Sequence, residues 1–244
     1  MFSIVIPVKD QSKIVRMCLD SLVKYYPQQE IVIVDDGSTE SRTISLLTEY
    51  CTKYNWKLFR NEKSVGHSGA CELGIENSTN ENICLLNSDT IVSSNGLQIL
   101  SDVLDNNKDI AVAGPSTSSA SGPQMLKQYY DKRFYMTQED IESAAKSLEN
   151  ETELVDLPLI CGFAFFIKKS VFNSAGKFDQ NLSCYGNEKE LLIRIRYAGY
   201  RTVWVKNSFI LHLGKMSYSN SGVDVPRAQV DADRYIIKKH GRLE

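Results

Sequence analysis

The chain has 244 residues, of which 42% are hydrophobic and 24% are charged. These proportions are typical of a globular protein with a buried core, and the length suits one α/β domain better than two. Its 28 basic and 30 acidic side chains leave a formal net charge of −2, without the basic excess that nucleic-acid-binding proteins carry. We therefore expect a single globular domain over residues 1–244 that does not bind nucleic acid.

The six cysteines are scattered without a CxxC pair, and most lie in apolar stretches, which indicates buried, reduced thiols. Met1 leads directly into an apolar strand without a secretory signal, and no apolar run reaches the roughly 18 residues that span a bilayer. We expect a cytoplasmic protein. A peripheral contact with the inner face of a membrane stays open through Lys238, Lys239 and Arg242, although a solvated C-terminal end is the simpler interpretation.

The first half of the chain alternates short apolar runs with amphipathic segments. This pattern predicts an α/β fold with a mostly parallel sheet flanked by helices. Ser12 is the expected N-cap of the first helix. Strands are expected at 2–8, 31–34, 57–60, 83–86 and 110–113, and helices at 12–26, 41–54, 69–78 and 95–106.

After Gly114 the chain changes character. A loop rich in serine, glycine and proline opens a polar segment, residues 116–157, in which we expect one or two helices. We interpret this segment as an insertion within one domain. Further strands are expected at 159–168, 202–205 and 209–213, and further helices at 188–198 and 226–239.

Asp35 and Asp36 follow an apolar strand, and Gly37 and Ser38 begin the turn into the next helix. Ligands of open α/β sheets bind at the carboxyl ends of the strands, so these two carboxylates are expected to face a crevice. A carboxylate there can accept hydrogen bonds from a base N–H or a ribose hydroxyl. The alternative is that Asp-Asp-Gly-Ser serves only turn and cap chemistry, and the motif alone leaves both open.

Asn87 and Asp89 follow another apolar strand and are two residues apart. On an extended segment both side chains point to the same face, where they can share a divalent cation and its bound diphosphate. Hard oxygen ligands of this kind suit Mg²⁺ or Mn²⁺. A short triplet is unspecific by itself, so this prediction depends on the rest of the chain.

In their order along nearly the whole chain, these motifs resemble the family-2 glycosyltransferases, which have the GT-A fold. The segments that carry the resemblance are IVIPV at 4–8, VDDGS at 34–38, SVGHSGACELGI at 64–75, NSD at 87–89, CGFAFFIKKSVFNSAGKFD at 161–179, NEKELLIRIRYAGYR at 187–201 and LHLGKMSYS at 211–219.

The resemblance implies a single GT-A domain with a Rossmann-like sheet. Residues 1–114 are implied as the nucleotide-binding half, and residues 115–244 as the acceptor-binding half with a variable excursion at 116–157. The implied activity is inverting transfer of a sugar from a nucleoside-diphosphate sugar to an acceptor hydroxyl of a glycan or lipid-linked glycan, in polysaccharide or glycan synthesis. The implied cofactor is Mn²⁺ or Mg²⁺. The implied nucleotide-binding residues are Pro7, Val8, Asp35, Asp36, Gly66, Ala70, Asn87 and Ser88, and the implied metal ligands are Asp89, His212 and Asn87.

Glu188 is implied as the catalytic base, with Glu190 as the second candidate. On a helix the two side chains lie about 200° apart, so only one can face the acceptor hydroxyl. The alternative for Glu188 is that it only complements the helix dipole. For His212 the alternative to metal binding is a structural role.

The acidic helix departs from the family pattern. It begins Asn-Glu-Lys-Glu, whereas the family usually has two acidic residues followed by an aspartate two positions further on. A second hypothesis therefore stays open, namely a nucleotide-sugar-binding module that has lost turnover. A dinucleotide-dependent oxidoreductase is disfavoured, because PVKDQS after the first strand lacks the glycines of a phosphate-binding turn.

Overall fold

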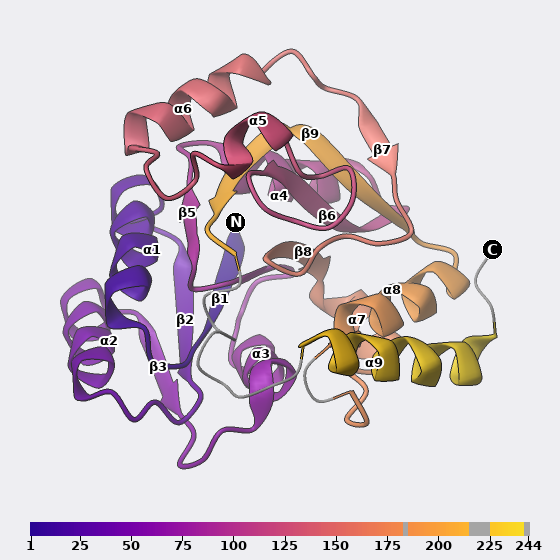
Figure 1. Cartoon of the computed structure of the whole chain (residues 1–244), viewed down its shortest axis with the longest axis horizontal. Coiled ribbons are helices and arrows are strands. Elements are labelled where there is room, and N and C mark those ends of the chain that lie inside the picture. The colour runs from indigo at the N-terminus through magenta and orange to yellow at the C-terminus, as the bar shows by residue number, and fades with distance from the viewer. Residues whose placement is uncertain (183–184, 215–224, 242–244) are drawn as a thin grey trace.

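The computed structural model describes residues 1–182, 185–214 and 225–241. Within these residues one nine-stranded sheet runs through the molecule with helices on both faces, which confirms the expected α/β fold (Figure 1). The strands are β1 (Phe2–Val8), β2 (Glu30–Asp35), β3 (Lys57–Arg60), β4 (Asn82–Leu86), β5 (Thr90–Val92), β6 (Ile110–Thr117), β7 (Leu154–Asp156), β8 (Ala164–Lys168) and β9 (Arg201–His212). The helices are α1 (Ser12–Tyr25), α2 (Ser41–Tyr54), α3 (Gly66–Glu76), α4 (Gly96–Asn106), α5 (Lys127–Tyr130), α6 (Gln138–Ser147), α7 (Lys169–Ala175), α8 (Asn187–Tyr197) and α9 (Val225–His240).

The sheet is mixed but mostly parallel. Its strand order is β3-β2-β1-β4-β8-β6-β9-β5, and β7 pairs with β9. Strands β1, β2, β3, β4, β6 and β9 share one direction, whereas β5, β7 and β8 run the opposite way. The parallel strands therefore end at one common edge, and strands from both halves of the chain contribute to it.

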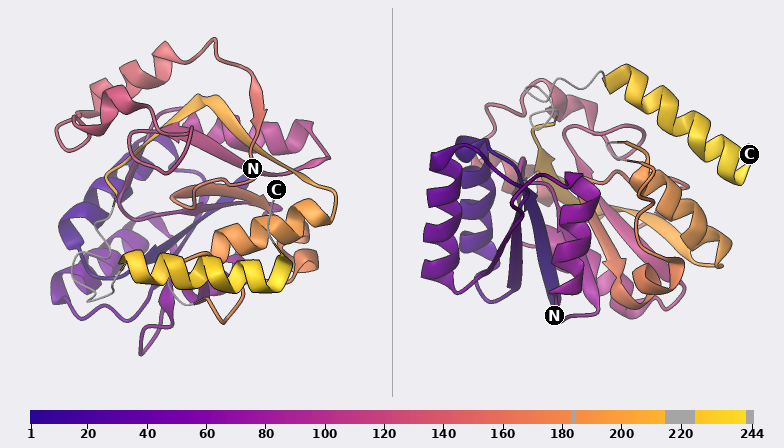
Figure 2. Two further views of the ribbon diagram at one scale, coloured as in Figure 1. Left: turned by 45° about the vertical axis from the view of Figure 1, so that its right-hand side comes forward. Right: turned by 90° about the horizontal axis from the view of Figure 1, so that it is seen from below.

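The two faces of the sheet are covered by different helices. On β1, Ile4 and Ile6 belong to the core cluster that contains apolar side chains of α1, α2 and α4. Val5, which points to the other face, belongs to the cluster with α3, α7 and α8. Side chains alternate along a strand, and β1, which is apolar except for Ser3, is buried on both faces, as Figure 2 shows for the sheet between its helices.

The start of α1 differs from the expectation for Ser12. The cap position is occupied by Gln11 in the left-handed conformation (φ 66°), and Ser12 is the first helical residue. The Ser12 hydroxyl instead donates to Glu40 Oε1 at 2.8 Å, just before α2. Asp10 accepts hydrogen bonds from the backbone N–H groups of Thr39 and Glu40. These contacts between the loops after β1 and β2 replace the local cap.

Several elements of the second half also differ from the predicted pattern. The predicted strand at 159–168 begins only at Ala164, and the two predicted runs at 202–205 and 209–213 form the single strand β9. A register shift opposite Pro115 and Ser116 of β6 explains why the apolar pattern of β9 is interrupted. The short elements β5, β7 and α7 were not expected from the sequence.

The excursion at 116–157 contains the tail of β6, then α5, α6 and β7. Thr137 and Asp140 form a capping box at the start of α6, and Ile141 packs with Phe209 and Leu211 of β9 in one core cluster. This segment lies on one side of the edge where the parallel strands end, and α9 lies on the other (Figure 1).

Helix α9 packs on α8 through Ile193, Ala232 and Ile236. Lys239, expected at a solvated or lipid-facing end, instead pairs with Asp179 at 2.6 Å and with Glu190 at 2.7 Å. Arg242 lies outside the described residues. Among the described helices, none combines the length and apolar character needed to cross a membrane.

The prediction of buried thiols is confirmed for four cysteines. Cys18, Cys51, Cys71 and Cys84 are free and buried, and Cys161 is free and partly buried. Burial raises the pKa of the Cys18 thiol to about 12, and the side-chain hydrogen bond between Cys18 and Thr90 acts in the opposite direction. Cys184 lies outside the described residues.

Candidate active site

Asp35 is the last residue of β2, and its carboxylate stabilises the turn that follows. Its Oδ1 accepts the backbone N–H of Ser38 at 2.8 Å, and its Oδ2 lies 3.2 Å from a guanidinium nitrogen of Arg60 on β3. The residue is only 2% exposed. Gly37 has φ +71°, and a Cβ atom there would lie 2.9 Å from the backbone nitrogen of Ser64. Only glycine therefore fits this turn without a backbone shift.

Asp36 ties the turn after β2 to the start of α3. Its carboxylate accepts four hydrogen bonds, from Asn61 Nδ2 at 2.9 Å, Ser64 Oγ at 2.6 Å, Val65 N at 2.8 Å and Gly66 N at 3.0 Å. The residue is 4% exposed. Both carboxylates are therefore buried, and the turn and cap contacts that the sequence left open as an alternative are present.

The other residues predicted to bind a nucleotide differ in how far they are exposed to solvent. Pro7, Val8 and Ala70 are buried. Gly66, Asn87 and Ser88 are partly exposed. Of this set, these three are the most accessible to a ligand.

Asn87, Ser88 and Asp89 connect β4 to β5 by a turn. The premise that Asn87 and Asp89 lie on an extended segment is therefore wrong. The turn is held by the Thr90 hydroxyl, which donates to the Asn87 carbonyl at 2.7 Å, and by the Asn87 N–H, which donates to the Phe163 carbonyl at 2.8 Å. Asp89 is 4% exposed.

His212 lies beside Asp89 because the last residue of β9 pairs with the first residue of β5. The register sets Thr90 opposite His212. His212 Nε2 lies 3.3 Å from Asp89 Oδ1. The other ring nitrogen, Nδ1, is 2.6 Å from the Ser119 carbonyl, and Phe163 stacks on the ring with centroids 4.8 Å apart. A carbonyl oxygen can only accept, so Nδ1 carries the proton in this contact, and Nε2 is the ring nitrogen that faces Asp89 and could bind a metal ion.

The Asp89 and His212 pair fits a divalent cation. Neighbouring ligand atoms around an octahedral Mg²⁺ or Mn²⁺ lie about 3 Å apart, since each is about 2.1 Å from the metal. The 3.3 Å separation in this chain is close to that value. Among the described residues, no group of three or more His, Cys, Asp or Glu side chains forms a complete metal cage. The remaining positions would therefore fall to a ligand diphosphate, water or the amide oxygen of Asn87.

Glu188 lies in the first turn of α8, which begins after Gly186 in the left-handed conformation. Its side chain is 29% exposed, and its Oε1 is 4.0 Å from His67 Nε2 on α3. A Cβ atom added to Gly162 would overlap the Glu188 carboxylate. The carboxylate is thus placed directly on the backbone of Gly162, where a larger residue would displace it.

Glu190 lies in a different environment. Its side chain is fully buried and forms ion pairs with Arg194 at 2.6 Å, Lys239 at 2.7 Å and His240 at 2.9 Å. Burial by itself would raise the pKa of Glu190, but the hydrogen bonds from Arg194, Lys239 and His240 outweigh it and hold the pKa below its ordinary value. Of the two carboxylates, Glu188 is the one that a ligand can reach.

The base candidate and the metal ligand candidates are joined by a short chain of contacts. Glu188 rests on Gly162, the adjacent Phe163 stacks on His212, and His212 faces Asp89. The roles of Ser119 and Phe163 could not be predicted from the sequence, since a serine carbonyl and an apolar phenylalanine carry no chemical signal of their own. In the predicted C-terminal motif, His212 and Gly214 are described, whereas Lys215 and the residues after it to 219 are not.

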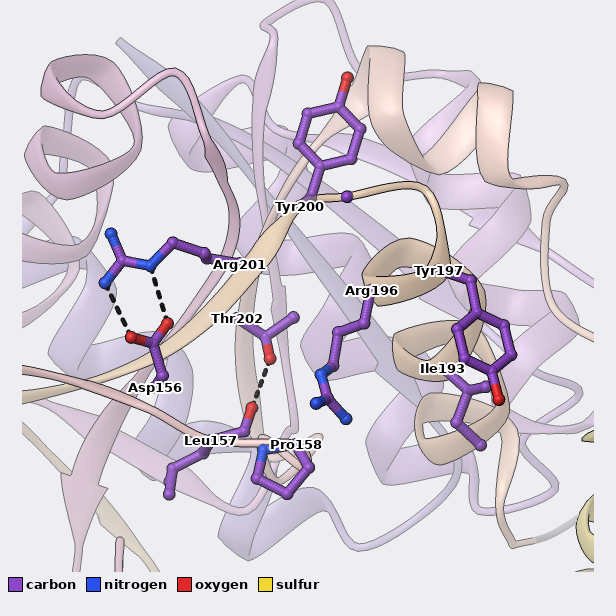
Figure 3. Close-up of a pocket in the computed structure, with 10 residues that line it drawn as sticks. Asp156, Leu157, Pro158, Ile193, Arg196, Tyr197, Tyr200, Arg201 and Thr202 are labelled. Atoms are coloured by element: carbon purple, nitrogen blue, oxygen red, sulfur yellow. Dashed lines mark hydrogen bonds and ion pairs between the residues drawn. The ribbon is translucent and has the colours of Figure 1, made fainter. Parts of the chain in front are cut away.

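A cavity of about 780 Å³ lies elsewhere, lined by the end of β7, the last turn of α8 and the start of β9. Figure 3 shows Arg201 paired with Asp156 on one side and Arg196, Tyr197 and Ile193 on the other. Because β9 runs from Arg201 to His212, this cavity lies at the opposite end of the strand from His212. It contains none of the predicted site residues.

The sequence profile described as Glycosyl transferase family 2 matches residues 3–176. A curated relative, "Glycosyltransferase GlyA" of Streptococcus pneumoniae serotype 4, is 24% identical over 179 residues, which are 72% of this chain and 25% of that protein. The crystal structure of GalNAc-T7 with UDP, GalNAc and Mn²⁺ has a TM-score of 0.74 at 19% identity, and covers 98% of this chain and 47% of that one. The structure of S. aureus TarS 1–349 in complex with UDP-GlcNAc has a TM-score of 0.71 at 16% identity, and covers 100% of this chain and 68% of that one.

The two structural likenesses show a shared fold, which is the GT-A-like fold. The chain spans only about a quarter of GlyA, so the activity of that whole protein does not transfer to it directly. The family profile, in contrast, covers most of this chain and includes the turns after β2 and β4. The chain therefore belongs to glycosyl transferase family 2.

Proposed function

We propose that this protein is an inverting, metal-dependent glycosyltransferase. It moves a sugar from a nucleoside-diphosphate sugar to a hydroxyl of a glycan or lipid-linked glycan. The observation that carries the proposal is the contact chain from Glu188 through Gly162 and Phe163 to His212 and Asp89. These contacts connect the proposed proton acceptor, Glu188, to the two proposed metal ligands, His212 and Asp89.

Glu188 acts as the general base in this proposal. An acceptor hydroxyl is a weak nucleophile because its pKa is high, so a carboxylate within hydrogen-bond reach must remove its proton as it attacks. Glu188 is partly exposed and placed by Gly162, whereas Glu190 is buried and paired with three basic groups. Attack from the side opposite the leaving diphosphate inverts the anomeric carbon.

Asp89 and His212, with Asn87 as a third ligand, would hold Mn²⁺ or Mg²⁺ together with the diphosphate. The cation supplies positive charge where negative charge develops on the departing diphosphate. The protein orients its ligands beforehand, since the Ser119 carbonyl holds one ring nitrogen of His212 and Phe163 packs on the ring face. Asp35 and Asp36 shape the nucleotide side of the site through the turn and the start of α3.

The alternative is a nucleotide-sugar-binding module without turnover, suggested by the Asn-Glu-Lys-Glu start of α8. The exposure of Glu188 favours the enzyme, because a carboxylate remains available at the helix start although the family's usual pattern is altered.

The test is release of nucleoside diphosphate from a panel of UDP-, GDP-, CDP- and dTDP-sugars, with Mn²⁺ or Mg²⁺ and with chelator. Release should require the metal and should be lost in Asp89→Ala and His212→Ala. Asp102→Ala, which changes an exposed carboxylate on α4, serves as the matched control and should keep full activity.

Each outcome of this test has a defined meaning. Metal-dependent binding of nucleotide without release from any donor would establish the binding module instead. Full activity in excess chelator, or unchanged release by Asp89→Ala, would remove the metal site from the proposal.

A further inference from the structure

Three aromatic side chains between α5 and α6 are exposed. Tyr130 is 37% exposed, Phe134 49% and Tyr135 84%. Single exposed apolar residues are ordinary, but three large rings within six residues concentrate apolar surface at one place, which is typical of a binding surface. We call Tyr130, Phe134 and Tyr135 the aromatic patch.

Arg133 contacts two rings of the patch, those of Tyr130 and Phe134. The guanidinium carbon of Arg133 lies 4.0 Å from the ring centroid of Tyr130 and 4.2 Å from that of Phe134. Its Nε donates to the Leu213 carbonyl at 2.8 Å. Such cation–π contacts and a backbone hydrogen bond orient the Tyr130 and Phe134 rings before any ligand arrives, so these two side chains have less entropy to lose on binding.

The same contacts place the aromatic patch beside the proposed site. Leu213 directly follows His212, and its N–H donates to the Asp89 carbonyl at 3.0 Å. Tyr129, one residue before the patch, packs edge to face on Phe209 of β9 at 5.3 Å. The patch is therefore attached, through Arg133 and Tyr129, to the end of the strand that carries His212, and Figure 1 shows α5 next to β9.

The charge around the patch indicates the kind of ligand. Residues 127–140 contain three basic and three acidic side chains, so their formal net charge is zero, and the guanidinium of Arg133 is already occupied by two rings and a carbonyl. An anionic membrane surface would instead select an excess of lysine and arginine. A neutral pyranose ring fits better, because one face exposes C–H groups that pack on an aromatic ring while its hydroxyls stay hydrated.

We propose that the aromatic patch binds neutral pyranose rings of the acceptor, next to the residue that receives the sugar. The proposal rests on the proposed glycosyltransferase function and extends it to the acceptor class. It predicts that the patch contributes to acceptor affinity and leaves the chemistry and the donor site unchanged.

The first test measures binding without donor. Chitotetraose, cellotetraose and maltotetraose are titrated into the wild type and the double variant Phe134→Ala/Tyr135→Ala by calorimetry. Tyr197→Ala is the matched control, because Tyr197 is 68% exposed but lies on α8 away from the patch. We expect saturable binding of at least one saccharide, weakened about tenfold in the double variant, and unchanged in the control. Absence of saturable binding by all three in the wild type, or equal affinity in the double variant, would overturn the proposal.

The second test separates this proposal from the function on which it rests. Hydrolysis of the donor by water needs no acceptor, so the double variant should keep its rate of nucleoside-diphosphate release while its KM for the bound saccharide rises. A wild type that binds saccharide but releases no nucleoside diphosphate would count against the proposed function alone. If the double variant instead lost binding to phosphatidylglycerol vesicles and kept saccharide affinity, the patch would be a membrane contact and the proposal would be wrong.

Discussion

Replacing Glu188 by glutamine should lower activity and leave stability nearly unchanged, whereas replacing Glu190 by glutamine should mainly lower stability. Glutamine keeps the shape of glutamate but removes the proton acceptor. Glu188→Gln should therefore lower transfer by roughly 10²–10⁴-fold, the usual contribution of a general base, while donor binding persists. Its melting temperature should stay near that of the wild type, because the side chain is 29% exposed and its ion-pair contact with His67, within the described part of the chain, is 4.0 Å long.

Glu190→Gln should act mainly on stability. The change removes the negative charge that faces Arg194, Lys239 and His240 at a fully buried position. Removing one partner of a buried ion pair costs about 3–5 kcal/mol. The lower end applies here, because Arg194 and Lys239 are partly exposed and keep other partners, namely the Lys177 carbonyl and Asp179. At roughly 2–4 °C per kcal/mol for a chain of this size, a loss of about 3 kcal/mol should lower the melting temperature by about 6–12 °C.

The assays are thermal unfolding followed by circular dichroism and release of nucleoside diphosphate below the melting temperature of each variant. Glu139→Gln is the matched control, since Glu139 is an exposed glutamate in the first turn of α6 and tests the helix-dipole effect alone. The reasoning would be refuted if Glu188→Gln kept wild-type transfer while Glu190→Gln melted normally and was inactive. The base would then be Glu190, and the buried network would be catalytic.

Three further outcomes follow from the contacts of the site. Asp36→Ala should lower the melting temperature, because the Asp36 carboxylate accepts four hydrogen bonds around the start of α3. A normal melting temperature combined with weak binding of the sugar nucleotide would instead show that Asp36 acts only as a nucleotide ligand. Gly162→Ala should displace the Glu188 carboxylate and so reduce kcat, while the KM for the sugar nucleotide changes little. Steady-state kinetics would measure both constants, and an unchanged kcat would mean that Gly162 does not position Glu188. Burial raises the pKa of Glu190, but hydrogen bonds led by that of Arg194 hold it below the ordinary value of 4.5, so its stabilising contribution is complete above that pH and is lost as the pH falls below it. Thermal unfolding from pH 7 to pH 3 should therefore show a steeper loss in the wild type than in Glu190→Gln, and parallel losses would contradict this account.

The first half of the fold could be predicted because its signals are local. The apolar run of β1 and the helical spacing in α1 and α2 recur within a few residues, so each strand and helix is visible in its own segment. The second half was harder to predict. The register shift in β9 interrupts its pattern, and β5 and β7 have three residues each, which is too short for a period to appear.

The sequence by itself determined the family, the α/β class, and the turns after β2 and β4 that carry carboxylate and amide side chains, because these features depend on residue types at short spacing. Tertiary structure alone decided which side chains meet. His212 faces Asp89 because β9 pairs with β5, and its ring is oriented by Ser119, more than ninety residues away in the chain. Glu190 is buried because α9 brings Lys239 and His240 onto it from about fifty residues further on. Such contacts between distant segments have no local pattern, since burial and ion pairing arise only when the elements pack.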